Sequence, residues 1–189
     1  MANSPEHPAF SEDNLLNERG LLEHVGVDVG QTVADMGTGR ECTFLLEAAR
    51  MVSQTGKVYA LDVVKEILEV VQGVATQAGL QNVETVWTDL EMYGAAKTVA
   101  DQTIDIGILA NTLSQSTDHM AMMKEAARMM KAGGRILVVE WKPVETVLGP
   151  PVAQRVSPEE IKQIALQLGI QVTDEFEAGE YHWALVLTK

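Results

Sequence analysis

The chain has 189 residues with 27 acidic and 14 basic side chains, which give a formal net charge of −13. This charge repels phosphates, so it disfavours nucleic acid and anionic membrane surfaces as partners and favours a small-molecule substrate. We expect one domain over residues 1–189, because a chain of this length buries enough apolar surface to fold without disulfides.

The N-terminal segment predicts a loose arm and then a helix. Residues 1–10 contain Pro, Ser and Glu where a secretory signal would carry a basic and then an apolar run, and no apolar stretch is long enough to span a bilayer. The single Cys42 cannot form an intramolecular disulfide, so the expected location is cytoplasmic. An amphipathic helix near residues 12–25, capped by Ser11, is a candidate cover for a ligand. Its packing face comprises Leu15, Leu16, Leu22 and Val25.

A short buried strand at residues 31–36 runs into a glycine turn, and a second strand at residues 58–62 ends in a carboxylate. Gly37 and Gly39 let the backbone approach a ligand closely, while Asp62 is placed to accept hydrogen bonds from a ribose. A Gly-x-Gly pair also occurs in ordinary loops, so the turn alone is a weak signal. The flanking strand and helix, and Asp89 after a third strand, make the pattern specific. Together they predict a site for an adenosine-type cofactor.

Strand and helix patterns alternate along the rest of the chain, which predicts a parallel sheet covered by helices. Further helices are expected at residues 43–52 and 64–78, from Ser116 to Gly133-Gly134, and from Ser157 to Gly169. Further strands are expected at residues 82–87, 104–110, 136–141, 170–176 and 181–188, the last two as an antiparallel hairpin. The predicted fold class is therefore α/β, a Rossmann-like doubly wound sheet of seven strands, six parallel and one antiparallel.

Two of these helices carry specific signals. Ser116 is the expected cap of a helix with a methionine-rich face, and packing of that face on the sheet explains it better than a partner-binding surface does. The face comprises Met122, Met123, Ala126 and Met130. The next helix starts with a cap, a first-turn proline and a capping-box glutamate, in the sequence Ser157-Pro158-Glu159-Glu160.

The order and content of these segments resemble class I S-adenosylmethionine-dependent methyltransferases, in the small-molecule, type 11-like branch. The resemblance covers nearly the whole chain after residue 11. It is carried by the segments 33–39, 61–62, 88–90 and 131–135, by Asn111 and by the final hairpin. It implies transfer of a methyl group from S-adenosyl-L-methionine to a small-molecule acceptor that these residues do not identify.

The resemblance also implies roles for the residues around the turn. Asp35 would orient the methionine end of the donor, and Asn111 would sit beside the sulfonium. The turn residues Gly37, Thr38 and Gly39 would lie beneath the methionine end.

At the nucleoside end, the same resemblance assigns the ribose hydroxyls to Asp62 and the adenine amino group to Asp89. Val63 and Leu90 would flank the adenine ring. Many such enzymes carry a third glycine where this chain has Glu41. Its side chain either crowds the cofactor or, as we prefer, lies in the first turn of the following helix, where a carboxylate is favoured.

Two alternatives stay open. A nicotinamide dinucleotide also uses a glycine turn and a strand-end carboxylate, but the third glycine of that fingerprint is replaced by Cys42. A non-catalytic adenosyl-binding or interaction protein on the same scaffold is motivated by Glu41 and by the weak case for a catalytic base.

A base is optional for methyl transfer, because alignment with an activated sulfonium supplies much of the catalysis. His182 and Glu140 are the candidates where a proton must leave, and each is also explained as an ordinary strand residue. The histidines are scattered and Cys42 is alone, so no metal site is expected. The proline-bearing connection at residues 142–156 is either a substrate lid or a rigid crossover. The oligomeric state is not specified by these residues.

Overall fold

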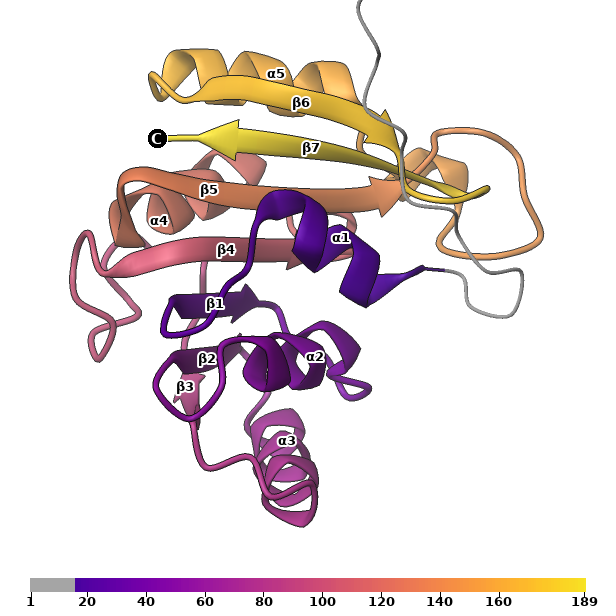
Figure 1. The fold of residues 1–189 in the computed structure, drawn as a ribbon. Coiled ribbons are helices and arrows are strands. Elements are labelled where there is room, and N and C mark those ends of the chain that lie inside the picture. Colours follow the sequence, from indigo (N-terminus) through magenta and orange to yellow (C-terminus); the bar gives the residue numbers. More distant parts are fainter. Residues whose placement is uncertain (1–15) are drawn as a thin grey trace, which may run out of the picture.

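Residues 16–189 are described by a computed structural model, in which seven strands form one sheet in the order β3-β2-β1-β4-β5-β7-β6 (Figure 1). The strands are β1 Thr32–Met36, β2 Lys57–Asp62, β3 Val83–Trp87, β4 Ile104–Ala110, β5 Met130–Trp141, β6 Gln171–Glu177 and β7 His182–Thr188. The first five in spatial order pair in parallel, and β7 is antiparallel to both β5 and β6. The predicted fold class is confirmed.

Helices cover both faces of this sheet (Figure 1). They are α1 Glu18–Val25, α2 Thr43–Met51, α3 Lys65–Gln77, α4 His119–Met129 and α5 Pro158–Gln167, with short 3-10 turns η1 Leu113–Gln115 and η2 Val152–Gln154. The first three α-helices pack on one face, and α4 and α5 pack on the other. No helix between residues 16 and 189 is long and apolar enough to cross a membrane. The strand order reverses between β1 and β4, so ligands are expected beyond their carboxyl ends.

The methionine-rich face of α4 lies in the core, as predicted. Met122, Met123 and Met129 are buried among apolar side chains of the sheet and of α5. Met130 is buried too, although it already belongs to β5. Packing against the sheet, and not a partner surface, therefore accounts for these residues.

The predicted boundaries of α4 are wrong at both ends. Asp118 caps the helix in place of Ser116, whose hydroxyl instead donates a hydrogen bond to Glu91 Oε1 (2.8 Å). The helix ends at Met129, before the expected Gly133-Gly134, because the next residue already pairs as part of β5. Strand pairing at this point overrides the glycine stop signal.

The two other predicted caps have different outcomes. The α1 helix is capped by Asn17, while the expected cap Ser11, Leu15 and the arm at residues 1–10 lie outside the described residues. The α5 cap is confirmed, because Ser157 Oγ accepts a hydrogen bond from the backbone N–H of Glu160 (3.3 Å).

Candidate active site

A tightly held glycine turn follows β1 and forms the floor of the site. Gly37 and Gly39 have φ angles of 84° and 66°, a region that favours glycine. The backbone N–H groups of Gly37 and Thr38 donate to Leu61 O at the end of β2 (2.8 and 3.1 Å). A Cβ on Gly37 would lie 2.2 Å from Thr112 Cγ2, whereas a Cβ on Gly39 would meet no atom within 4 Å. The backbone at Gly39 is therefore fixed in place but open on its outer side.

The carboxylate of Asp62 ties the end of β2 to this turn. Its Oδ2 accepts a hydrogen bond from Gly39 N (3.1 Å), and its Oδ1 accepts one from Val64 N (2.9 Å). Asp62 is 8% exposed, so the carboxylate is almost fully shielded. Each carboxylate oxygen has a second lone pair, so the group can accept hydrogen bonds from ligand hydroxyls while it holds the turn.

Two hollows lie on either side of the turn at the carboxyl edge of the sheet. The larger has a volume of about 640 Å³ and the smaller about 200 Å³. Gly37, Gly39 and Gln115 line both, so the turn is their shared wall. The structure thus provides an extended binding site that bends across the glycine turn.

The smaller hollow brings together the four residues predicted for the nucleoside end. These are Asp62, Val63, Asp89 and Leu90, from the ends of β2 and β3. Val63 is 59% exposed and Leu90 is buried, so the first is free to contact a ring while the second is anchored in the core. Asp89 Oδ1 accepts a hydrogen bond from Glu91 N (2.9 Å), which fixes this carboxylate at the rim.

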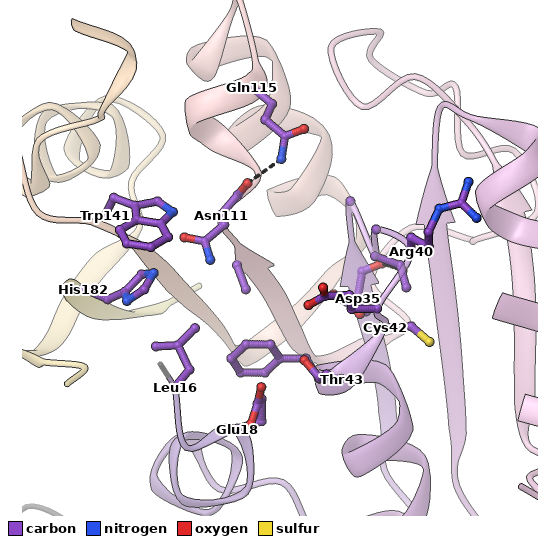
Figure 2. A pocket seen from close by; sticks show the side chains of 16 residues that line it. Leu16, Glu18, Asp35, Arg40, Cys42, Thr43, Asn111, Gln115, Trp141 and His182 are labelled. Atoms are coloured by element: carbon purple, nitrogen blue, oxygen red, sulfur yellow. Dashed lines mark hydrogen bonds between the residues drawn. The ribbon is translucent and has the colours of Figure 1, made fainter. Parts of the chain in front are cut away.

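The larger hollow brings together the residues predicted for the methionine end, Asp35, Thr38 and Asn111, and it is also lined by Trp141 and His182, which lie across it from Asp35 (Figure 2). Asp35 is 3% exposed, and burial together with the nearby charge of Asp62 raises its pKa to about 7. A cationic group beside Asp35 would favour its ionised form. This end of the hollow therefore suits a positively charged ligand group.

Asn111 follows β4 and has a strained backbone. Its φ is 54°, which is uncommon for a residue other than glycine. Its backbone is fixed, since its N–H donates to Val139 O (2.8 Å) and its carbonyl accepts from Gln115 Nε2 (2.7 Å). Its side-chain Oδ1 is buried without a hydrogen-bond partner among the described residues. Strain and an unpartnered oxygen together are typical of a functional position.

His182 begins β7 and packs against Trp141, which ends β5. The two residues are paired in register, and their ring centroids are 4.1 Å apart with an interplanar angle of 43°. Burial, aided by the positive charges of Lys142 and Arg155, lowers the pKa of His182 to about 4. The imidazole is therefore neutral at neutral pH.

Glu140 does not line either hollow, so the structure does not bring this predicted catalytic residue to the site. Successive side chains of a strand point to opposite faces of the sheet, and the neighbouring Trp141 is the one that faces the larger hollow. Glu140 is fully buried and its Oε1 accepts a hydrogen bond from Ser114 N in η1 (3.2 Å). Burial raises its pKa to about 7. Its position suits support of the turn after β4.

The preferred interpretation of Glu41 is wrong in placing it in the helix, although its side chain does point to solvent. Helix α2 begins at Thr43 after Cys42, whose φ of 44° breaks the helical path, so Glu41 precedes the helix. Its side chain is exposed at the rim of the larger hollow. A carboxylate at this rim does not fill the space over Gly39.

Several residues of the site were not predicted. Leu16, which precedes α1, and Glu18, which begins it, line the larger hollow, and Phe44 reaches it from α2. Thr112, which packs on Gly37, was also missed because a contact between distant segments has no local sequence signal. Among the described residues, no three His, Cys, Asp or Glu side chains form a group that could hold a metal ion.

The chain is similar to known proteins in sequence and in fold. A family model of a methyltransferase domain matches residues 27–179. The ubiquinone/menaquinone biosynthesis C-methyltransferase UbiE of Haemophilus ducreyi is 32% identical over 131 residues, which are 67% of this chain and 48% of that protein. The chain thus spans about half the length of the curated relatives it matches.

Among solved structures, a SAM-dependent methyltransferase from Aquifex aeolicus has a TM-score of 0.84 at 28% identity, covering 92% of this chain and 89% of that one. The [4+2]-cyclase SpnF has a TM-score of 0.76 at 15% identity, covering 91% and 80% of the two chains. The second similarity is one of fold alone.

We expect alanine substitutions at the two glycines of the turn to lower the free energy of unfolding by different amounts. Gly39→Ala places a left-handed alanine in open space and should lower the free energy of unfolding by about 1–2 kcal/mol. Gly37→Ala adds a collision with Thr112 and should cost about 1–3 kcal/mol more. Urea denaturation measures both, and Thr112→Ala should recover part of the loss in Gly37→Ala only. Equal losses for the two alanine variants would contradict the described packing.

Because Glu140 is buried, we expect the free energies of unfolding of the wild type and of Glu140→Gln to differ by an amount that depends on pH. Because its pKa is higher in the folded chain, its stabilising effect is complete below the ordinary pKa of 4.5 and is lost as the pH rises to about 7. The free energy of unfolding of the variant should therefore rise relative to that of the wild type over this pH interval, by on the order of 3 kcal/mol. The pKa shifts of Asp35 and His182 are present in both proteins, so they cancel in the difference between the two free energies of unfolding. A constant difference between pH 4 and pH 8 in denaturation experiments would refute the buried acid.

Proposed function

The chain belongs to the methyltransferase domain family, and from this premise we propose that it transfers a methyl group from S-adenosylmethionine to a small-molecule acceptor. One observation carries the proposal: the shielded Asp62 carboxylate holds the open Gly39 backbone between two hollows. This arrangement suits a ligand with a ribose in the middle and different groups at its two ends. When bound, S-adenosylmethionine supplies an electrophilic methyl group on its sulfonium.

The residues at the two ends support this donor. In the smaller hollow, the exposed Val63 and the anchored Leu90 offer apolar surfaces for an adenine ring, and Asp89 offers an acceptor for its amino group. In the larger hollow, the buried Asp35 favours a cationic amino-acid end, and the unpartnered Asn111 Oδ1 offers an acceptor beside it. A Cβ at Gly39 would occupy the space into which the ligand must fit.

Charge favours a sulfonium over a nicotinamide dinucleotide. Among the described residues that line the two hollows, the acidic ones are Glu18, Asp35, Glu41, Asp62, Asp89 and Glu91, and the basic one apart from His182 is Arg40. Carboxylates attract a cationic donor and repel a pyrophosphate. The dinucleotide alternative is therefore the weaker one.

Catalysis is proposed to depend mainly on alignment of the acceptor with the donor methyl group. His182 remains the predicted base for an acceptor that loses a proton, because it lines the larger hollow and is neutral. With a pKa of about 4 it is a weak base, so its contribution should be modest. Glu140 has no proposed part in the chemistry, since it lies outside both hollows.

The weak base motivates a second, less favoured candidate, a protein that binds an adenosyl cofactor without transferring its methyl group. The two functions differ in turnover. Incubation with donor carrying a labelled methyl group and a panel of phenols, amines and carboxylic acids should yield labelled product if the protein is an enzyme. Tight donor binding without any labelled product would favour the binder. We further propose that the protein works in the cytoplasm, which the single Cys42 permits.

Substitution of Asp62 tests the proposed donor site. Asp62→Ala should weaken binding of S-adenosylmethionine and S-adenosylhomocysteine by roughly 30-fold or more, because two hydroxyls lose a charged acceptor and Gly39 loses its anchor. The exposed Glu69→Ala removes the same charge from α3 and should bind both ligands normally. Isothermal titration calorimetry gives the affinities, and circular dichroism checks folding.

Normal affinity in a folded Asp62→Ala variant would remove Asp62 from the donor site. Tighter binding of a nicotinamide dinucleotide than of S-adenosylhomocysteine by the wild type would contradict the proposed cofactor.

A further inference from the structure

The His182 imidazole presents two hydrogen-bonding nitrogens that nothing in the described chain satisfies. The residue is 1% exposed, and neither Nδ1 nor Nε2 has a hydrogen-bond partner among residues 16–189. Buried polar atoms without partners are rare, because each one loses its bond to water. His182 lines the larger hollow and points toward it (Figure 2). A bound molecule is the natural source of the missing partners.

Aromatic and aliphatic side chains share the hollow with His182. The Trp141 indole packs on the imidazole, and Phe44 and Leu16 line the same hollow. Figure 2 shows Trp141 and His182 across the hollow from Asp35, with Asn111 between the two sides. This end is therefore separate from the glycine turn and suits a flat ring that carries one hydrogen-bonding group.

Arg155 fixes the outer wall of this end. Its guanidinium makes five hydrogen bonds of 2.6 to 3.0 Å, one for each N–H, and every acceptor is a neutral oxygen of the connection after β5. The acceptors are the backbone carbonyls of Lys142, Val144, Leu148 and Pro150 and the hydroxyl of Thr146. The connection is thus folded around one side chain, which favours the rigid crossover over the mobile lid.

The same connection holds Trp141 in place. Gly149 approaches the indole so closely that a Cβ there would lie 2.6 Å from Trp141 Cδ2. The guanidinium carbon of Arg155 lies 5.6 Å from the centre of the indole ring, within range of a cation–π contact. Arg155 therefore acts on the hollow through Trp141, as a positioning residue.

Charge narrows the kind of ligand. Within the described chain, no carboxylate pairs with Arg155, so its positive charge is compensated only by dipoles. Lys142, the other cation near His182, contacts the carboxylate of Glu177. At this end of the hollow, a positive charge beside the indole that has no carboxylate partner disfavours an amine and favours an oxygen that carries partial negative charge.

We propose that the Trp141 and His182 side chains form the acceptor subsite, and that it takes a planar ring with a weakly acidic hydroxyl that hydrogen-bonds to His182. The inference rests on the proposed methyltransferase function, because only that function makes the bound ring a methyl acceptor. Binding of the ring to the subsite does not require turnover. A hydroxyl both donates and accepts, so it satisfies either ring nitrogen. Arg155 keeps the Trp141 wall of the subsite in place.

Phenol, toluene and benzylammonium are matched probes of this subsite. In protein carrying ¹⁵N-labelled histidine, phenol should shift the imidazole nitrogen signals of His182, which are identified by their absence in His182→Phe. Toluene should shift them much less, and benzylammonium should bind more weakly than phenol. His182→Phe should bind phenol about tenfold more weakly and toluene equally well, because only the hydrogen bond is removed.

Arg155→Lys should weaken the binding of phenol and of toluene alike, because the Trp141 wall is loosened while the His182 nitrogens remain. It should leave the affinity for S-adenosylhomocysteine unchanged. The wild-type titration decides the inference, and His182→Phe serves in it only to identify the His182 signals. Unshifted His182 signals at saturating phenol, or equal shifts with toluene, would overturn it. Calorimetry with S-adenosylhomocysteine on the same sample reports the proposed function separately, since failure of donor binding leaves the phenol result intact.

Discussion

The contact between the Asp62 carboxylate and the N–H of Gly39 (3.1 Å) is the interaction on which the rest of the site depends. It joins the end of β2 to the turn after β1, beside the place between β1 and β4 where the strand order reverses. Together with the hydrogen bonds from Gly37 N and Thr38 N to Leu61 O, it fixes the turn and thereby the relation between the two hollows on its sides. Since the same carboxylate also accepts from Val64 N, it orients the start of α3 as well.

The two sides of the turn differ in how completely their polar groups are paired. In the smaller hollow, Asp62 and Asp89 already accept backbone hydrogen bonds, so this side is preformed. In the larger hollow, Asn111 Oδ1 and both nitrogens of His182 lack partners in the described chain, and Asp35 carries a raised pKa. Such groups reduce stability unless a ligand completes them. Of the five such atoms in the described chain, three belong to residues that line the larger hollow, while Thr88 Oγ1 belongs to the smaller hollow and Glu140 Oε2 lies outside both.

The parts of the molecule that could be predicted from the sequence are those with local signals. The alternation of strand and helix patterns predicted the sheet, and Ser157 was predicted correctly as a helix cap. The proposed donor site was predicted from the turn at Gly37 to Gly39 and from the carboxylate of Asp62. Features that depend on distant contacts could not be read. Glu140 was assigned to the site because it ends a strand, but the phase of the strand turns it to the opposite face.

The same limit applies to α4 and to the wall of the larger hollow. Ser116 is a good cap by type, but a side chain from another loop, Glu91, occupies its hydroxyl. The five bonds of Arg155 appear only once the connection has folded around it. The proline content of that connection marked it as unusual without showing what holds it.

The most direct test of the account is a crystal structure of the protein with S-adenosylhomocysteine. We expect both ribose hydroxyls within hydrogen-bonding distance of the Asp62 carboxylate, the adenine between Val63 and Leu90, and the amino-acid end beside Asp35. Adenosine bound elsewhere, or a ribose turned away from Asp62, would contradict the central claim.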